Sequence, residues 1–428
     1  MINSLVLNPI KFVNGDVFLP GSKSISNRVL ILASLSKGIT CIKNLLDSED
    51  TKHMLNALKI AGVSYSLSKD KKLCQIYGNG KNFLKQNKTI NLFLGNAGTA
   101  IRPLVSLFSL YKNEIFITGN DRMKNRPIKH LVDALRQGGA KIFYQEKKNY
   151  PPVLVKGGFI GGKIELKGNI SSQFLTSILI MSPLAKLDTK IKIIGNLVSK
   201  PYIEMTIKLM KVFGINVVNN NYKFFFIKGN SEYKTPGVYT IEGDASSASY
   251  FLAAAAIKGG TVTVHGVGKN SIQGDVYFAK ILKKIGSIIS FGENFISCSK
   301  RELKSINLDM NNIPDAAMTV AIVALFCSGT THIKNIYNWK VKETDRLEAM
   351  SNELKKVGAV VKQGNDYLTI IPPKKFLYSE IETYNDHRIA MCFSLIALSN
   401  VSTKIINPDC VNKTFPNYFK ELNSISHY

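Results

Sequence analysis

The sequence lacks the features that would point to a secreted, membrane-bound or zinc-binding protein. Its six cysteines are widely spread, with no Cys-x-x-Cys or Cys/His cluster, so neither a disulfide framework nor a metal site is expected. Its longest strongly apolar runs, residues 250–257 and 316–327, are too short to cross a membrane. Residues 1–15 show no basic start, apolar block or cleavage site of a signal peptide. We therefore expect a cytoplasmic protein with no membrane partner.

Two common nucleotide-binding loops are also missing, and acidic residues are scarce. Gly-x4-Gly-Lys-Ser/Thr is absent, and no Gly-x-Gly-x-x-Gly follows a predicted strand. There are 30 Asp plus Glu against 56 Lys plus Arg, a formal net charge of +26. Such a balance is typical of nucleic-acid-binding proteins, but these lysines are dispersed and the chain is generally rich in Lys, Asn and Ile. We interpret the charge mainly as compositional bias and expect no nucleic-acid partner.

A repeat runs through the chain. The 428 residues, 45% hydrophobic and 20% charged, are typical of a globular protein with two or three domains. Predicted helices that end in a cation, a glycine and a β-like run recur at separations of 77, 75, 72 and 72 residues, with their glycines at Gly62, Gly139, Gly214, Gly286 and Gly358. One more period predicts a truncated sixth copy near the C-terminal end of the sequence.

A second series of predicted helix starts has the same period. Its members lie 75, 72, 75, 69 and 71 residues apart, and each is a residue type that caps helices: Ser24, Thr99, Ser171, Ser246, Asp315 and Asp386. Each unit thus holds two helices and several strands. One core stops growing beyond roughly 250 to 300 residues, so we predict two halves of three units each. The predicted domains are residues 1–21 plus 241–428, which is discontinuous, and residues 22–240.

The stretch Leu19–Gly38 predicts a short strand, a Pro-Gly turn and a helix that ends before Gly38. Lys23 falls at the helix start, where the macrodipole disfavours cations. Ser24 and Arg28 are four residues apart and share a face. A phosphate or carboxylate bound at the helix start would explain this arrangement. The alternative is a solvated, serine-rich cap with incidental basic residues.

More candidates lie at helix starts of the first half. Asn96 can cap a helix, Gly98 lets a ligand approach the backbone, and Arg102 lies near the first turn, although an ordinary turn would also explain them. Three cations precede the next helix as either an anion-binding wall or a solvated charge run: Arg122, Lys124 and Arg126. Hydroxyl and amide groups that suit a polyol, or capping alone, stand at two further helix starts: Ser171, Ser172, Gln173, Ser199 and Tyr202.

In the second half, carboxylates and cations stand close together. Asp315 lies at the mouth of a very apolar helix, as either a cap or a general base. Lys342, Glu343 and Arg346 precede an amphipathic helix, and surface ion pairing is the alternative to a site. A helix start and a loop near the C-terminal end add further charged groups: Asp386, His387, Arg388 and Lys413.

These stretches resemble the signatures of one enzyme family. PGSKSISNR, LGNAGTAIRPL, RMKNRPI, SSQFLTS, VSKPYIEMT, IPDAAMT, NWKVKETDR, YNDHR and KTFP are similar, in the same order, to motifs of the glyphosate-sensitive class of EPSP synthases, which are enolpyruvyl transferases. The resemblance implies an α/β fold of two similar domains, each with three repeated two-helix plus β-sheet units in an inverse α/β barrel-like arrangement. It also implies an active site in an interdomain cleft that closes on the substrates. We expect a monomer.

The resemblance also implies a reaction. The family transfers the enolpyruvyl group of phosphoenolpyruvate to the 5-hydroxyl of shikimate 3-phosphate and releases phosphate, in the shikimate pathway to chorismate and aromatic amino acids. No metal or organic cofactor takes part. Cations gathered around two anionic substrates, and a carboxylate pair that accepts one proton and donates another, suit this chemistry.

Residue roles follow by matching motif. The resemblance assigns shikimate 3-phosphate to Lys23, Ser24, Arg28, Ser171, Ser172, Gln173, Ser199, Asp315, Asn338 and Lys342. It assigns phosphoenolpyruvate to Lys23, Gly98, Arg122, Gln173, Arg346, Arg388 and Lys413. Asp315 would take the proton of the 5-hydroxyl, and Glu343 would protonate the methylene carbon. Lys23 is the third expected catalytic residue.

Two other functions fit parts of the sequence. The sister enolpyruvyl transferase that acts on UDP-N-acetylglucosamine has the same repeats, but it generally carries a cysteine in the loop that corresponds to residues 119–126, and this chain has none there. A nucleic-acid-binding scaffold would explain the charge but would leave Asp315 and Glu343 without a role. A steep salt-dependent affinity for duplex would be needed to support it.

Overall fold

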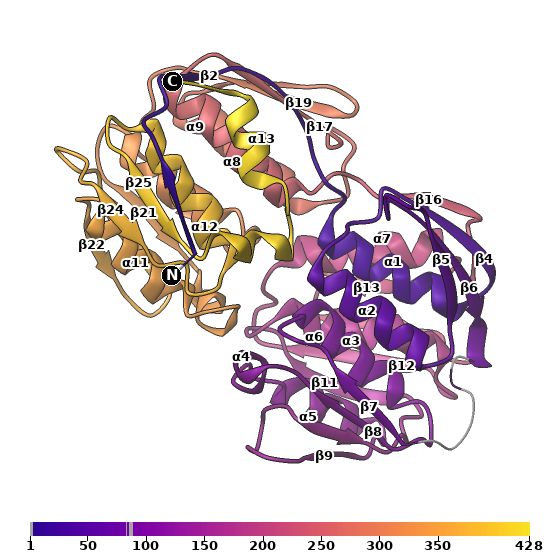
Figure 1. Cartoon of the computed structure of the whole chain (residues 1–428). Coiled ribbons are helices and arrows are strands. Elements are labelled where there is room, and N and C mark those ends of the chain that lie inside the picture. The colour runs from indigo at the N-terminus through magenta and orange to yellow at the C-terminus, as the bar shows by residue number, and fades with distance from the viewer. Residues whose placement is uncertain (1–2, 83, 85–88) are drawn as a thin grey trace. The chain divides into compact units, whose positions relative to one another are not determined.

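The computed structural model describes residues 3–82, 84 and 89–428. The chain divides into two compact units (Figure 1). We call residues 1–20 with 242–428 the terminal unit, and residues 21–241 the central unit. Both boundaries lie one residue away from the boundaries expected from the repeat.

Six of the seven sheets among the described residues repeat one strand pattern; the seventh is the antiparallel pair of β2(Phe12–Val13) and β26(Ser426–His427). Two strands run parallel, the second pairs antiparallel with a third, and the third pairs antiparallel with a fourth. In the central unit two such sheets have the orders β7(Ile90–Phe93)-β8(Ile115–Thr118)-β10(Val153–Val155)-β9(Ile142–Tyr144) and β11(Gly162–Lys167)-β12(Thr189–Ile194)-β14(Phe224–Ile227)-β13(Val218–Asn220). In the terminal unit the same pattern is seen in β20(Asn307–Asp309)-β21(Thr331–Lys334)-β23(Tyr367–Ile371)-β22(Val360–Gln363) and, without a fourth strand, in β24(Ser379–Ile381)-β25(Thr403–Ile406)-β1(Ser4–Leu7).

The two remaining sheets of this pattern show where the chain passes between units. Strand β3(Gly15–Phe18) precedes the first helix of the central unit, but it pairs in parallel with β17(Thr261–His265) of the terminal unit, whose sheet continues through β19(Phe295–Ser299) to β18(Ile288–Phe291). Conversely, β16(Val238–Thr240) precedes the first helix after the central unit, yet it pairs in parallel with β4(Ser36–Lys43) beside β6(Leu73–Asn79) and β5(Ser64–Leu67). The two units have exchanged equivalent strands, which makes the terminal unit discontinuous.

Each parallel strand pair is associated with one buried helix. These six helices are α1(Lys23–Leu35), α3(Gly98–Phe108), α6(Ser172–Met181), α8(Ala245–Lys258), α10(Ala317–Val323) and α12(His387–Ser394). They contact one another within each unit: α1 and α6 both contact α3, and α8 and α12 both contact α10. The sequence pattern predicted one buried face for the first helix, but α1 is buried on nearly all sides because α2(Glu49–Ile60) and α7(Lys200–Val212) also cover it.

In five of the six repeats, the second helix is followed within two residues by the predicted glycine. After α2, α5(Lys129–Gln137), α7, α9(Tyr277–Ile285) and α11(Arg346–Lys356), the glycine has a positive φ between 83° and 130°, a conformation that a side chain would strain. The predicted sixth copy is α13(Tyr418–Ser424). The sixfold repeat and the α/β fold class are confirmed.

The helix starts themselves needed correction. Ser171 and Asp386 are caps whose side chains accept backbone N–H groups. Ser24, Thr99 and Ser246 instead lie inside the first turn, because α1, α3 and α8 begin one residue earlier than predicted. The predicted end of α1 was also late: the helix stops at Leu35, and position 38 already belongs to β4.

Candidate active site

In the central unit, Lys23 is the first residue of α1 and is buried. Its Nζ lies 3.6 Å from Oδ2 of Asp50, a buried residue in the first turn of α2. Asp50 also accepts a hydrogen bond from Thr99 at 3.3 Å, and Thr99 accepts one from Asn27 at 2.9 Å. The unfavourable position of a cation at a helix start is therefore offset by a buried carboxylate, and the interpretation of the lysine as a solvated, incidental residue is wrong.

Arg28 is a buried cation that donates hydrogen bonds to three neutral oxygen atoms. Its Nε donates to Thr206 Oγ1 at 2.9 Å, Nη2 donates to Thr176 Oγ1 at 3.3 Å, and Nη1 donates to the carbonyl of Ser24 at 2.9 Å. Burial lowers the pKa of Arg28 to about 10, although Tyr202 acts in the opposite direction. The group thus stays charged at neutral pH, and no carboxylate among the described residues forms an ion pair with it, which suits it to an anionic ligand.

Gly98, the first residue of α3, lies beside two buried arginines. A Cβ at this position would lie 2.3 Å from Nη1 of Arg102 and 2.7 Å from Nη2 of Arg126. Arg102 Nη1 donates to Gln173 Oε1 at 2.9 Å, and Arg126 Nη1 donates to Asn96 Oδ1 at 2.8 Å. The glycine is therefore needed for close packing against guanidinium groups, and Asn96 binds Arg126 instead of capping the helix.

The remaining predicted residues of the central unit differ in their surroundings. Arg122 lies on the short helix α4(Asp121–Lys124) and is only half-buried, while Lys124 makes an exposed ion pair with Glu146. Ser172 is buried, next to the cap Ser171. Ser199 has a φ of 54° and caps α7 without a side-chain hydrogen bond to the helix. Left-handed backbone at a non-glycine residue is costly and concentrates at functional sites.

In the terminal unit, Asp315 is surrounded by three cations. Its Oδ1 is 2.9 Å from Nη1 of Arg346 and 3.3 Å from Nζ of Lys342, and its Oδ2 is 3.0 Å from Nη2 of Arg388. Arg346 also pairs with Glu343 at 2.9 Å through Nη2. Because α10 begins at residue 317 with Ala316 as its cap residue, the interpretation of Asp315 as a helix cap is wrong.

This cluster is buried, so its ion pairs are not surface pairs. The Arg346 side chain is 1% exposed and that of Glu343 10%. Burial by itself would raise the pKa of Asp315, but Arg388, Lys342 and Arg346 outweigh it and hold that pKa well below its ordinary value. Burial likewise opposes the charge of Arg346, yet its carboxylate partners raise the pKa of Arg346 above the ordinary value. Asp315 and Arg346 therefore stabilise each other's charged forms, and Asp315 is a weak base while it keeps three cationic partners.

Asp386 holds two of the predicted binding arginines in place. Its Oδ2 accepts from Nε of Arg346 at 2.7 Å, and its Oδ1 accepts from the backbone N–H of Arg388 at 2.9 Å as the cap of α12. Asn338 and Lys413 are buried in the same unit. The Oδ1 atom of Asn338 has no hydrogen-bond partner among the described residues, which is unusual for a buried amide.

Some residues of these clusters were missed from the sequence. Arg126 was named only as one of three cations in an anion-binding wall or a solvated charge run and received no ligand of its own, Asp386 was named only at a helix start, and Asp50 was not named at all. Asp50 lies on a second helix of its repeat, in an ordinary capping stretch, so no local signal singles it out. Its proximity to Lys23 comes from the packing of α1 against α2.

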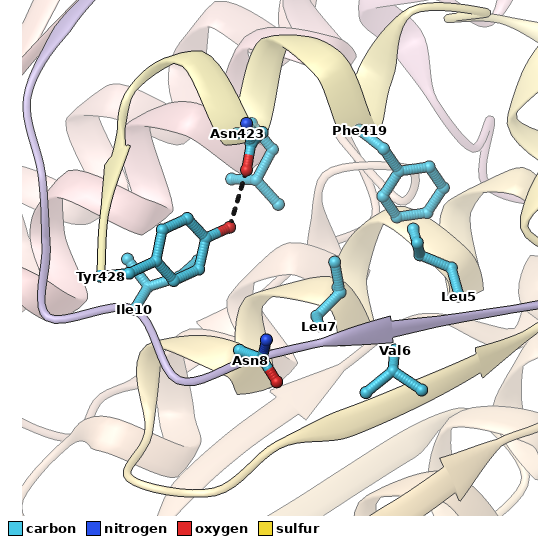
Figure 2. Close-up of a pocket in the computed structure, with 9 residues that line it drawn as sticks. Leu5, Val6, Leu7, Asn8, Ile10, Phe419, Asn423 and Tyr428 are labelled. Atoms are coloured by element: carbon cyan, nitrogen blue, oxygen red, sulfur yellow. Dashed lines mark hydrogen bonds between the residues drawn. The ribbon is translucent and has the colours of Figure 1, made fainter.

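The terminal unit also has a hollow of a different character. Figure 2 shows it between β1 and α13, lined by apolar side chains such as Leu5 and Phe419 and by Asn8, Asn423 and Tyr428. None of its lining residues is charged, and none is a predicted site residue. It does not suit a phosphorylated substrate.

Neither a metal cluster nor a membrane helix is found in the part of the chain that the structure describes. No three His, Cys, Asp or Glu side chains among residues 3–82, 84 and 89–428 are grouped to hold an ion. No helix within those ranges is long and apolar enough to span a bilayer.

The fold consists of α/β repeats, and buried cations lie at the starts of several of their helices. A pair of carboxylates lies beside some of these cations. This combination defines a class of protein that binds anionic small molecules. Comparison with known proteins specifies the family. The sequence model of the family described as EPSP synthase (3-phosphoshikimate 1-carboxyvinyltransferase) matches residues 7–422, and the chain belongs to this family.

Relatives match over their full length. A 3-phosphoshikimate 1-carboxyvinyltransferase of Buchnera aphidicola subsp. Acyrthosiphon pisum is 64% identical over 426 residues, with 100% of both chains covered. One from Escherichia coli is 58% identical, with 99% of both chains covered. A solved structure of EPSP synthase from Acinetobacter baumannii is 27% identical with a TM-score of 0.82, covering 99% of this chain and 98% of that one. These matches confirm the resemblance and the two-domain α/β fold class.

Proposed function

We propose that this protein is a transferase that moves the enolpyruvyl group of phosphoenolpyruvate to the 5-hydroxyl of shikimate 3-phosphate and releases phosphate. Full-length membership of the EPSP synthase family supports this reaction. The observation that carries it within the structure is Asp315, buried among three cations with Glu343 on one of them. Acid, base and anion-binding groups are thereby gathered in one cluster. The UDP-N-acetylglucosamine alternative is not favoured, because the family model and the relatives from Buchnera aphidicola and Escherichia coli carry the name 3-phosphoshikimate 1-carboxyvinyltransferase.

The substrate-binding roles are proposals that the contacts of each unit support. We assign shikimate 3-phosphate to the groups expected from the motifs, which include Arg28 with its neutral partners and Asn338 with its unpaired amide oxygen. Phosphoenolpyruvate is assigned to Lys23, Gly98, Gln173, Arg346, Arg388 and Lys413. In place of Arg122 we assign Arg126, because it is buried and its Nη2 would lie 2.7 Å from a Cβ at position 98.

The proton steps involve two carboxylates with different surroundings. Asp315 accepts the proton of the 5-hydroxyl, and Glu343 delivers one to the methylene carbon. In the described arrangement the cations around Asp315 suppress its basicity. Anionic substrates that attract Lys342, Arg346 and Arg388 would relieve that suppression, so substrate binding and activation of the base are linked.

We further propose a cytoplasmic monomer that acts without nucleic acid or cofactor. Six free cysteines, four of them buried, suit a reducing compartment. The dispersed lysines do not form a stripe along one part of the sequence.

The decisive assay is phosphate release from phosphoenolpyruvate with and without shikimate 3-phosphate. We expect release only with both substrates, unchanged after treatment with a chelator. Release that a chelator abolishes and a divalent ion restores would contradict a metal-free reaction. Absence of release with both substrates would refute the proposed function.

A further inference from the structure

Arg388 has a second side-chain contact in addition to its pair with Asp315. Its Nη1 donates to the hydroxyl of Tyr250 at 3.2 Å, while Nη2 pairs with Asp315 at 3.0 Å. Tyr250 lies on α8, is 1% exposed, and packs edge-on against Tyr418 with ring centroids 5.6 Å apart. The tyrosine is thus rigid, and its hydroxyl reaches the guanidinium from helix α8, whereas the Asp315 carboxylate comes from the turn before α10.

A neutral acceptor is the right chemistry at this position. Burial raises the pKa of Tyr250 well above its ordinary value, against the opposing effect of Arg388, so the phenol is uncharged at any working pH. A second carboxylate there would cancel the charge of the arginine and compete with an anionic ligand. A hydroxyl fixes the orientation of the guanidinium and leaves its charge available.

We propose that Tyr250 is a positioning residue that orients the Arg388 guanidinium for the anionic substrate through its hydroxyl. This inference rests on the proposed function, in which Arg388 binds phosphoenolpyruvate. When that anion draws Nη2 of Arg388 away from Asp315, the bond from Nη1 to the Tyr250 hydroxyl can remain and limit the rotation of the side chain. Tyr250 itself takes no part in proton transfer.

The test is Tyr250→Phe, which removes only the hydroxyl. A lost hydrogen bond to a charged group corresponds to a change in affinity of roughly tenfold or more. We expect the KM for phosphoenolpyruvate to rise roughly tenfold, with the KM for shikimate 3-phosphate unchanged and kcat much less affected.

The matched control is Tyr418→Phe. Tyr418 is equally buried and touches Tyr250, but its hydroxyl bonds to Ser394 at 2.8 Å and to the carbonyl of Met391 at 3.0 Å. We expect it to lower the thermal midpoint as Tyr250→Phe does while leaving the KM for phosphoenolpyruvate unchanged. Equal KM values in the two variants, or an equal rise of both substrate KM values in Tyr250→Phe, would overturn the proposal.

A double-mutant cycle with Arg388→Lys separates positioning from a general loss of stability. A lysine has a single ammonium nitrogen and cannot reproduce the separate contacts that Nη1 and Nη2 of Arg388 make. Tyr250→Phe should therefore have little further effect on the KM for phosphoenolpyruvate in that background. Full additivity would overturn the proposal. Wild-type turnover tests the proposed function independently of these variants, and direct calorimetric binding of phosphoenolpyruvate compares Tyr250→Phe with wild type even without turnover.

Discussion

Replacing Gly98 by alanine should disturb two arginines at once. The new Cβ would lie 2.3 Å from Arg102 Nη1 and 2.7 Å from Arg126 Nη2, whereas ordinary contacts begin at 3.4 Å. The two guanidinium groups must therefore retreat by about 1.1 Å and 0.7 Å. Both are the ends of long side chains, but both are buried and hydrogen-bonded, so the shift strains their bonds to Gln173 and Asn96.

Each strained bond belongs to a charged donor, for which complete loss costs about 1.5 to 3 kcal/mol. Partial loss at both arginines predicts a KM for phosphoenolpyruvate that is roughly tenfold higher. Glyphosate is the longer molecule and needs more of the same space, so its inhibition constant should rise more than the KM does. Competition with phosphoenolpyruvate in the wild-type protein is part of this expectation.

Steady-state kinetics with glyphosate on both proteins decides the matter. The matched control is Gly138→Ala, whose Cβ would lie 2.3 Å from the Phe159 ring, away from these cations. It should lower stability without changing the ratio of inhibition constant to KM. Equal glyphosate sensitivity in wild type and Gly98→Ala would refute the reasoning.

Three more predictions follow from the clusters. Asp315→Asn and Glu343→Gln should each lower turnover by roughly 10², the scale of a lost acid or base group; near-normal turnover in both would leave them only a structural role. Because cations outweigh burial and hold the folded-state pKa of Asp315 below its unfolded value, the carboxylate stabilises the fold above about pH 4 and loses this contribution as pH falls. Urea unfolding between pH 6 and pH 3, on the order of that titration range, should therefore show a steeper loss of stability in wild type than in Asp315→Asn; parallel curves would argue against the low pKa. Finally, Arg126→Lys should raise the KM for phosphoenolpyruvate roughly tenfold, and Arg122→Lys should change it little; the reverse order would restore the assignment to Arg122.

The repeat was predictable from the sequence because short local patterns mark each copy. A glycine with positive φ must follow each second helix, and it stands at a nearly constant interval in all five full copies. The exchange of β3 and β16 between the units has no such signal. The sequence of such a short strand is compatible with either parallel partner. Long-range packing determines which of the two partners it pairs with.

Helix starts were less predictable because capping residue types are also common inside first turns. Ser24 and Thr99 are of residue types that cap helices, but the observed cap residues are Ser22 and Ala97, two positions earlier, and neither makes a side-chain cap bond. A helix start without such a bond leaves backbone donors to be satisfied by something else. In a family that binds phosphorylated substrates, the failure of the capping rule at these positions is consistent with donors kept for ligands.

The ion pairs between these charged side chains could not be predicted from the sequence, for a physical reason. Arg346 was expected to bind phosphoenolpyruvate, and the structure shows it bound to Asp315, Glu343 and Asp386. The sequence shows which charged residues lie near a helix. The pKa of each residue and its interaction with a ligand also depend on burial and on partners from other helices. With Lys342 and Arg388 included, three cations face three carboxylates inside the terminal unit. An incoming anion therefore meets cations that are already paired with carboxylates of the protein. The affinity for the anion depends on the free energy needed to break those ion pairs. Because one of the carboxylates is the proposed base, the competition that weakens binding is the same one that frees Asp315 to accept a proton.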